Sequence, residues 1–388
     1  MAHPKRPVRG EGKCAAGTRY GAGGPPAEVP RSVGARSRAS TKRRRIAMVS
    51  AALGTLGALT AGVALTTPDS TAGPRRSAAG SDAAAAAPAH VGARSFAGPD
   101  ADPKPEKCED GSDPAESLKP DGAAGAAVQR IQDRGPHGRL IVGVDQNSYL
   151  WGYRDPTTGD LVGFDIDLAK EIGADLLGED PNITFKTIPT DQRIHALEKG
   201  DVDMIVRTMT ISCDRSEDVA FSTAYFEAGQ QMLVPKKNSR VKGFDASLRG
   251  RKLCYASGST AETLMKQDAY RQLGARTVTG PHQLDCLVRL QLGEADAIVT
   301  DSALGAGQAA QDPSVQLIGE PLTVEPYGIA MNLKDEDLVR RVNKVLDDYR
   351  KGGKGSKWRA AYDKWLAEDM RETQKGGDPA PPKPKYRD

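Results

Sequence analysis

Hydroxyl side chains and an arginine follow an apolar, β-branched run in residues 202–226. The run is typical of a buried strand, and after it come Thr208, Thr210, Ser212 and Arg215. Where a strand of an α/β protein ends at a pocket, backbone N–H groups, hydroxyls and a guanidinium can converge on one anion. A guanidinium binds a carboxylate through two parallel hydrogen bonds. The pattern therefore predicts a carboxylate site, although Arg215 taken alone would more simply be a surface residue.

Strands and helices alternate on both sides of this segment, which predicts an α/β fold with parallel sheets. The expected strands are 140–144, 183–188, 202–206, 251–256, 277–279, 297–300, 315–318 and 327–333. The expected helices start near 164, 193, 260, 283, 336 and 357. Two extended crossings, near 228–235 and 321–328, would join two lobes. A cleft between lobes is a common place for a ligand.

The N-terminal part differs in charge from the rest of the chain. Residues 1–45 hold 12 Lys and Arg against Glu11 and Glu28, and their Gly, Pro and Ser content is typical of a disordered leader. The whole chain carries +3, so residues 46–388 carry −7. Because the positive charge is confined to the leader, the folded part is not expected to bind nucleic acid.

The uncharged residues 46–67 follow the basic residues 42–45. About 20 apolar residues span a bilayer, so 46–67 is expected to be a signal peptide or a membrane anchor, with a buried core helix as the remaining alternative. The basic flank places the N-terminus in the cytoplasm and residue 68 onward outside. We therefore expect an exported protein, secreted or anchored at the extracellular face of the cytoplasmic membrane.

Composition also suggests the domain boundaries. Residues 68–135 are rich in Ala, Gly, Pro and Asp and are expected to be a disordered linker. The tail, 371–388, is Pro-rich and typical of polyproline II. Between them, lobe 1 is expected to comprise 136–231 and 325–370, and lobe 2 to comprise 232–324, which is enough chain for two lobes of ordinary size.

Four of the five cysteines lie outside the leader, at Cys108, Cys213, Cys254 and Cys286. An even number of cysteines in an exported chain implies two disulfides, for which three pairings are possible, and free buried thiols are the alternative. The sequence has no C-x-x-C motif and no clustered histidines. We therefore expect neither a metal site nor another cofactor.

Short motifs, in order along the chain, resemble family 3 of the extracellular solute-binding proteins, the polar-amino-acid receptors of ABC importers. The segment GFDIDLAKEI resembles the signature of that family. The further matching segments are GVDQNSY, TMTISCDRSEDVAFSTAYF, KLCYASGSTAETL, GEADAIVTD and EPYGIAM. The resemblance covers about 138–370. The cysteines, TISCDR and the Pro-rich ending look most like the glutamate- and glutamine-type binding proteins of actinobacteria.

The resemblance implies two α/β lobes, joined by two crossover strands, that close over a zwitterion. It assigns Arg215 to the α-carboxylate of the ligand and Asp301 to its α-ammonium. The hydroxyl residues that it places around the carboxylate are Thr208 and Thr210 in lobe 1, and Ser259 and Thr260 at a helix N-terminus in lobe 2. These residue types fit an α-amino acid, because it needs an anion site and a cation site a few ångströms apart.

The residues expected around the ligand side chain favour different ligands. Arg193 occupies the position where glutamate and aspartate receptors carry an arginine, with the Thr190 hydroxyl nearby, although a surface position is the alternative. Arg207 replaces the family's usual small residue and favours an acidic or amide ligand. Asp145 stands where receptors for basic amino acids use an acid, which favours a basic ligand instead. Trp151 is expected either to cover the ligand methylenes or to lie in the core.

We expect a receptor that is not an enzyme and acts as a monomer. It would bind glutamate, aspartate, glutamine or asparagine and deliver it to the permease subunits of an ABC importer. A sensor that signals through a membrane partner is the first alternative. An enzyme of periplasmic dehydratase type on the same fold is the second, but it would need a poised general acid or base. The histidines have no catalytic spacing.

We further expect Cys254 to pair with Cys286 and Cys108 with Cys213. The first bond would join two segments of lobe 2. The second would fix the end of the linker to lobe 1, which would account for a cysteine in a stretch that otherwise has no regular pattern.

Overall fold

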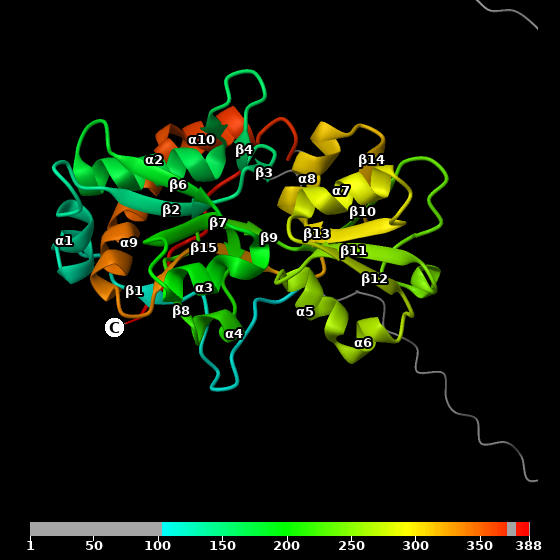
Figure 1. Ribbon diagram of the computed structural model, residues 1–388. Coiled ribbons are helices and arrows are strands. Elements are labelled where there is room, and N and C mark those ends of the chain that lie inside the picture. Colours follow the sequence, from blue (N-terminus) through cyan, green and yellow to red (C-terminus); the bar gives the residue numbers. More distant parts are fainter. Residues whose placement is uncertain (1–102, 371–377, 388) are drawn as a thin grey trace, which may run out of the picture. The chain divides into compact units, whose positions relative to one another are not determined.

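The computed structural model describes residues 103–370 and 378–387 (Figure 1). The expected leader 1–45, the expected signal or anchor 46–67 and the linker up to residue 102 lie outside the described residues. Within the described ranges, every helix is too short or too polar to cross a bilayer.

The sheet of lobe 1 has the strand order β6-β2-β7-β15-β8, with β9 paired to β15. Its strands are β2 (Leu140–Val144), β6 (Ile183–Thr187), β7 (Met204–Thr210), β8 (Val219–Phe221), β9 (Phe226–Ala228) and β15 (Glu325–Asn332). A small sheet, β3 (Asn147–Ser148), β4 (Gly152–Arg154) and β5 (Leu161–Val162), follows β2. Every residue of β7 is buried, because β7 lies at the centre of the sheet between β2 and β15.

Helices cover both faces of this sheet (Figure 1). One face packs against α1 (Ala126–Gln132), α2 (Phe164–Leu177), α9 (Glu336–Arg350) and α10 (Lys357–Trp365). The short helices α3 (Arg193–Glu198), preceded by the 3-10 turn Thr190–Gln192, and α4 (Cys213–Ser216) lie toward the other face. Helix α9 buries the stripe Leu338, Val342, Val345 and Tyr349, whose spacing of three to four residues keeps one face apolar.

The sheet of lobe 2 has the order β12-β11-β13-β10-β14. Its strands are β10 (Gln230–Pro235), β11 (Lys252–Ala256), β12 (Arg276–Gly280), β13 (Ala297–Asp301) and β14 (Val315–Ile318). Its helices are α5 (Thr260–Lys266), α6 (Asp268–Arg271), α7 (Gln283–Gln291) and α8 (Ser302–Gln311). Figure 1 shows α7 and α8 on one face of the sheet, and α5 and α6 on the other.

Both sheets combine parallel and antiparallel pairs. The strands joined through helices run parallel, as the alternation predicts: β2 with β6 and β7, and β11 with β12 and β13. The two crossover strands run antiparallel to their neighbours, because each enters its sheet from the other lobe. Strand β10 pairs antiparallel with β13 and β14, and β15 with β7, β8 and β9.

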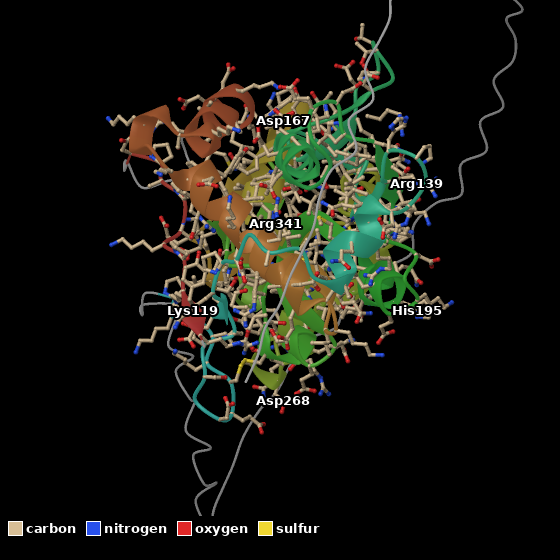
Figure 2. All side chains as sticks on the ribbon, turned by 90° about the vertical axis from the view of Figure 1, so that its left-hand side faces the viewer. Lys119, Arg139, Asp167, His195, Asp268 and Arg341 are labelled. Atoms are coloured by element: carbon tan, nitrogen blue, oxygen red, sulfur yellow. A yellow bond between two sulfur atoms is a disulfide. The ribbon has the colours of Figure 1, made fainter. Side chains whose placement is uncertain are left out.

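The structure corrects the expectation for residues 103–135, which the composition assigns to a disordered linker. These residues contribute β1 (Ser117–Leu118) and α1 to lobe 1. The Ser117 hydroxyl donates to the carbonyl of Phe221 (2.6 Å) and accepts from Asn343 (2.8 Å), both buried. Helix α9 also holds this segment: Arg340 donates to the carbonyl of Lys119 (3.2 Å), and Arg341, labelled in Figure 2, donates to the carbonyl of Gly122.

The described part of the tail is also ordered. Strand β16 (Tyr386–Arg387) pairs in parallel with β1, and the Lys385 ammonium contacts the carboxylate of Asp113 at 2.7 Å. Composition could not predict this, because a Pro- and Lys-rich segment buries little apolar surface by itself. Here the N-terminal segment (residues 103–125) provides the hydrogen-bond partner of β16 through β1.

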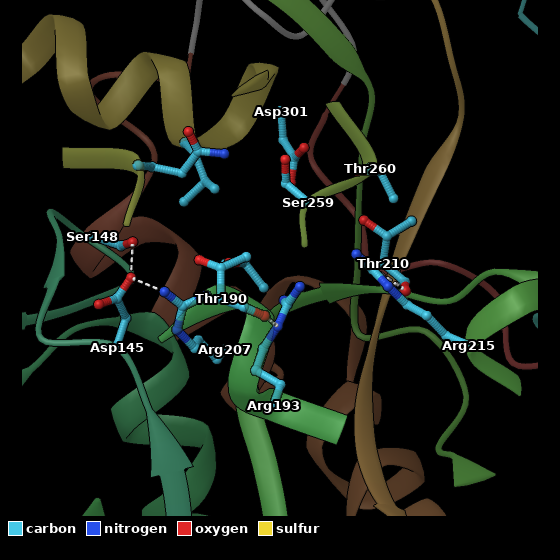
Figure 3. A pocket seen from close by; sticks show the side chains of 13 residues that line it. Asp145, Ser148, Thr190, Arg193, Arg207, Thr210, Arg215, Ser259, Thr260 and Asp301 are labelled. Carbon is cyan, nitrogen blue, oxygen red and sulfur yellow. Dashed lines mark hydrogen bonds and ion pairs between the residues drawn. The ribbon is translucent and has the colours of Figure 1, made fainter. Parts of the chain in front are cut away.

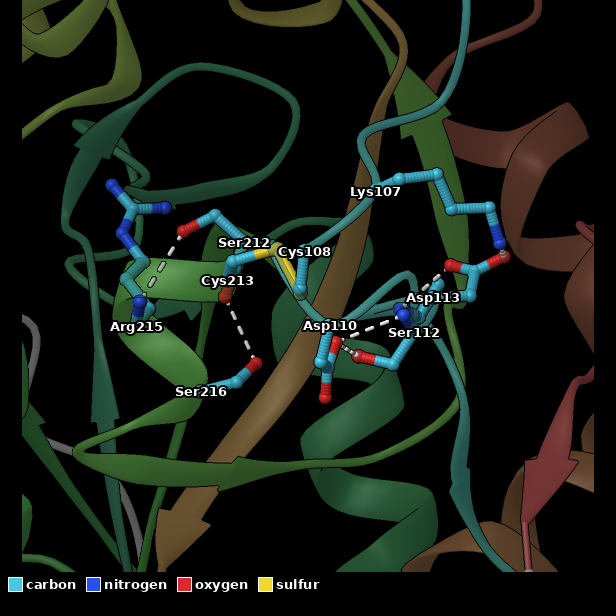
Figure 4. The surroundings of a disulfide bond; sticks show 10 residues. Lys107, Cys108, Asp110, Ser112, Asp113, Ser212, Cys213, Arg215 and Ser216 are labelled. Atoms are coloured by element: carbon cyan, nitrogen blue, oxygen red, sulfur yellow. Dashed lines mark hydrogen bonds and ion pairs between the residues drawn. A yellow bond between two sulfur atoms is a disulfide. The ribbon is translucent and has the colours of Figure 1, made fainter.

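Both predicted disulfides are present. Cys108 pairs with Cys213 and Cys254 with Cys286, each with a Cα–Cα distance of 5.5 Å. Figure 4 shows the first bond joining the N-terminal segment to α4, with Arg215 on the same helix.

Candidate functional site

A cavity lies between the two lobes and is lined by residues of both. Ten of the eleven binding residues predicted from the sequence line it, and only Trp151 does not. The lining residues that sequence reasoning missed are Ser148, Gln283 and Leu304. In Figure 3, Asp301 and Ser259 face Thr190 and Arg193 across the cavity.

Arg215 lies in α4, just beyond the end of β7. The Ser212 hydroxyl caps this helix by accepting from the backbone N–H of Arg215 (3.4 Å). The guanidinium donates to the carbonyl of Thr210 (2.8 Å) and, across the cavity, to the carbonyl of Gly258 in lobe 2 (3.1 Å). Burial lowers the pKa of Arg215, while Glu325 and further acids oppose that shift.

Arg193 begins α3, and its side chain is 4 % exposed. Its guanidinium donates to the carbonyl of Thr190 (2.8 Å) and to the same carbonyl of Gly258 (3.2 Å). Burial and the neighbouring cations Arg215 and Arg207 lower the pKa of Arg193 well below its usual value. Neither Arg193 nor Arg215 forms an ion pair with a carboxylate of the described residues.

Arg207 differs, because it has a carboxylate partner: its guanidinium lies 2.9 Å from the carboxylate of Asp145, and both side chains are 4 % exposed. Asp145 also accepts from the hydroxyl of Ser148 (2.7 Å) and from the backbone N–H groups of 146–147 (2.8 and 3.1 Å). Burial disfavours the charge of Asp145, but Arg207 and the nearby His282 of lobe 2 lower its pKa. Asp145 therefore already has four hydrogen-bond donors.

Thr208 has a left-handed backbone (φ 40°), a conformation that costs a β-branched residue energy and is kept only where neighbours fix it. Its N–H donates to the buried carboxylate of Asp165 (3.0 Å) and to the hydroxyl of Tyr225 (3.2 Å). Burial raises the pKa of Asp165 to about 7, although the Tyr225 hydrogen bond opposes the shift. Asp165, in the first turn of α2, therefore fixes the backbone beside the cavity, a role that nothing in the sequence indicated.

The hydroxyl residues of the site have different partners. Ser259 caps α5: its oxygen accepts from the N–H of Glu262 (3.3 Å) and its hydroxyl donates to the carbonyl of Ala256 (2.6 Å). Thr260 and Thr210, from opposite lobes, both donate to the carboxylate of Glu325 (2.8 and 3.0 Å). The Thr190 hydroxyl oxygen is buried without a hydrogen-bond partner among the described residues.

Asp301, at the end of β13, belongs to a buried group of polar residues on the crossover strands. It accepts from the hydroxyl of Tyr327 (2.7 Å) and from the side-chain amide of Gln230. The same amide donates to Glu325 (3.0 Å), which begins β15. Burial and the charge of Glu325 raise the pKa of Asp301 to about 8. Sequence reasoning missed Gln230, Glu325 and Tyr327, although the last two belong to the motif EPYGIAM.

The structure places Trp151 in the core of lobe 1 and not over the cavity. Its side chain is fully buried, packs edge-on against Phe226 (centroids 4.8 Å apart) and donates from Nε1 to the carbonyl of Ala303 (3.2 Å). Of the two alternatives that the sequence left open for this aromatic, the core position is the one observed.

The cavity therefore offers two guanidinium groups without a carboxylate partner on one side, Arg193 buried and Arg215 half-buried, and a carboxyl group on the other. Further unpartnered buried polar atoms line it, among them Arg207 Nε and Gln283 Oε1. Unpartnered buried polar groups cost free energy, so this arrangement suits a small polar molecule that carries both anionic and cationic groups.

The comparisons with known proteins agree with this geometry. Residues 140–368 match the bacterial extracellular solute-binding proteins, family 3. The chain is 36% identical over 234 residues to the ABC transporter glutamine-binding protein of Bacillus subtilis, covering 60% of this chain and 83% of that protein. It is 27% identical to the glutamate/aspartate import solute-binding protein of Salmonella typhimurium, covering 63% of this chain and 80% of that protein.

A solved structure of a mutant of ArgBP from T. maritima has 32% sequence identity and a TM-score of 0.56, covering 62% of this chain and all of that chain. These relatives are binding proteins, and the extracellular location of the family agrees with the export predicted from the sequence. The match extends over most of the described residues and over both lobes. The chain therefore belongs to the bacterial extracellular solute-binding proteins, family 3.

Proposed function

We propose that this protein is an exported receptor that binds a polar α-amino acid between its lobes and delivers it to an ABC importer. The amino acid belongs to the group of glutamate, aspartate, glutamine and asparagine. The names of the relatives support this group, since one is a glutamine-binding and another a glutamate/aspartate import protein.

The observation that carries the proposal is the distribution of charge around the cavity. Arg207 and Asp145 neutralise each other. Arg215 and Arg193 bond only to backbone carbonyls among the described residues, so both can take a carboxylate, which is a stronger acceptor. Asp301 lies on the other side and can take an ammonium group. Two carboxylates and one ammonium are the charged groups of glutamate and aspartate.

The same reasoning ranks the ligands. A buried cation without a counter-ion is costly, and the carboxylate of an acidic side chain would compensate Arg193, whereas an amide would only hydrogen-bond to it. We therefore expect acidic amino acids to bind more tightly than their amides. Asp145 favours a basic ligand only if it is released from Arg207 and its other three donors.

Isothermal titration calorimetry of the full chain against the twenty amino acids tests the proposal. We expect binding of the four named amino acids and no tight binding of lysine or arginine. Arg193→Met should weaken glutamate and aspartate binding by at least about 30-fold, the effect of leaving one buried charge unpaired. The loss for glutamine and asparagine should be several times smaller. Tight binding of lysine or arginine would contradict the proposed ligand class, and equal losses for acids and amides would contradict the role of Arg193.

The partner in this proposal is the permease of an ABC importer, and signalling through a membrane receptor is the alternative. Amino-acid uptake by cells that lack the protein distinguishes the two. Loss of uptake of the bound amino acid supports delivery to an importer. Unchanged uptake together with a lost cellular response to that amino acid supports sensing.

A further inference from the structure

Asp301 and Glu325 form a pair of buried acids where the two crossover strands meet. Both side chains are 5 % exposed, and a single nitrogen, Nε2 of Gln230, donates to both carboxyl groups, so the two acids lie side by side. Asp301 lines the cavity and Glu325 does not. Two adjacent carboxylates repel each other where water is excluded, which favours the state in which one of the two carboxyl groups carries a proton.

The remaining neighbours of the pair donate hydrogen bonds. Glu325 accepts from Gln230 and from the hydroxyls of Thr210, Thr260 and Thr323 (2.8–3.1 Å). Asp301 accepts from Gln230 and Tyr327. These donors stabilise one negative charge on the pair. They do not supply the positive charge that a second ionisation would need in a buried place.

The charged groups that face the pair come from several elements. Arg215 of α4 and Arg193 of α3 face it from lobe 1 and favour ionisation. Glu106, in the N-terminal segment, interacts electrostatically with Glu325, and burial raises the pKa of Glu106. Arg193 and Arg215 are also the cations that the ligand carboxylates would bind. Neither arginine therefore remains available to the acid pair once a ligand is bound.

We propose that Asp301 and Glu325 hold one proton between them before the ligand binds, and that the ligand's ammonium group displaces this proton into the solvent. Glu325 is then a positioning residue, which acts on the ligand through Asp301. The inference rests on the proposed function, because it requires a ligand with an ammonium group. The exchange balances: one proton leaves the pair, and one ammonium charge takes its place.

The direction of the pH dependence follows from the raised pKa of Asp301. With a pKa of about 8, Asp301 is mostly protonated at pH 7, so binding should release most of one proton there. The dissociation constant should fall by about ten-fold or more between pH 6 and pH 8, provided that the bound ammonium lowers the pKa of Asp301 below this range.

Calorimetry of L-glutamate binding to the full chain in buffers of different ionisation enthalpy, such as phosphate and Tris, measures the released proton. We expect the unmodified protein to release most of one proton at pH 7, and Glu325→Gln to bind the ligand but to lose most of this release. Glu106→Gln is the matched control, because it makes the same change in an acid near Glu325 but outside the pair. It should keep the release.

Several outcomes would overturn the proposal. Binding without proton release by the unmodified protein would refute the inference and leave the proposed function intact, whereas failure to bind any amino acid would refute the proposed function. Full release by Glu325→Gln would also refute the inference. Loss of the release in Asp165→Asn instead would assign the proton to Asp165, the other buried acid with a raised pKa.

A second variant covers the case in which Glu325→Gln does not fold. Tyr327→Phe removes the hydroxyl that donates to Asp301 and keeps the ring in its aromatic surroundings. Because that hydrogen bond stabilises the Asp301 carboxylate, its loss should raise the pKa of Asp301 and move the pH dependence of the affinity to higher pH. An unchanged pH profile in Tyr327→Phe would refute the proton-holding pair.

Discussion

Replacement of Arg215 is the strongest test of the carboxylate site. Arg215 lines the cavity, and its guanidinium makes two hydrogen bonds to carbonyls, at 2.8 and 3.1 Å, that a ligand carboxylate could replace. A hydrogen bond that involves a charged group contributes about 1.5–3 kcal/mol, so two such bonds to a carboxylate contribute about 3–6 kcal/mol. Arg215→Ala should therefore weaken amino-acid binding by about 100-fold or more.

The assay is calorimetry with L-glutamate and L-glutamine, combined with thermal unfolding followed by circular dichroism. Arg215→Lys should also bind poorly, because an ammonium cannot donate two parallel hydrogen bonds. Arg271→Ala is the matched control, since Arg271 is an exposed arginine that pairs with Asp268 far from the cavity, and it should bind normally. A folded Arg215→Ala protein with unchanged affinity would refute the carboxylate site.

Two further predictions concern closure and stability. Gly258 has φ 73°, and a Cβ there would lie 2.6 Å from the Cα of Asp191 in the other lobe. Gly258→Ala should therefore hinder closure of the lobes and weaken ligand binding by about 10-fold or more, which calorimetry can measure. Normal affinity in that variant would show that the lobes need not approach so closely. Replacing both Cys108 and Cys213 by Ala removes a disulfide between residues 105 apart in the sequence. The loss of this loop closure should lower the free energy of unfolding by about 4–5 kcal/mol, which denaturant titration can measure. A loss below about 1 kcal/mol would mean that the packing of the N-terminal segment does not depend on the bond.

Periodicity predicted the longer strands of both lobes and the helices α2, α3, α5, α7, α9 and α10, but it missed α8 and the short helices α1, α4 and α6. The first seven residues of α8 are all buried, so that helix has no polar face there to mark it in the sequence. Periodicity could not predict the antiparallel direction of β10 and β15. That direction depends on where a crossing chain enters the second sheet, which is a property of the whole fold. The order of residues 103–135 and the strand β16 in the tail were not predicted for a similar reason, since these segments are held by contacts with lobe 1 and with each other.

Of the residues that line the cavity, the sequence predicted ten and missed Ser148, Gln283 and Leu304, and it also missed the residues that support them. Glu325, Gln230 and Asp165 have their functional atoms turned toward other protein groups, and nothing in their local pattern separates them from ordinary strand and helix residues. Trp151 was a candidate for ligand contact but does not line the cavity. Its side chain packs against the ring of Phe226 and donates to a carbonyl in α8, and these contacts hold it in the core.

The carbonyl of Gly258 connects the two arginines with closure of the lobes. It accepts from Arg193 and from Arg215 at similar distances, so two cations of lobe 1 are bonded to a single oxygen of lobe 2. One carbonyl cannot compensate two positive charges, one buried and one half-buried, whereas two carboxylates of a ligand can. A dicarboxylic amino acid would therefore strengthen the contact between the lobes at the point where the protein alone provides too few acceptors. On this reasoning, binding and closure depend on the same pair of arginines.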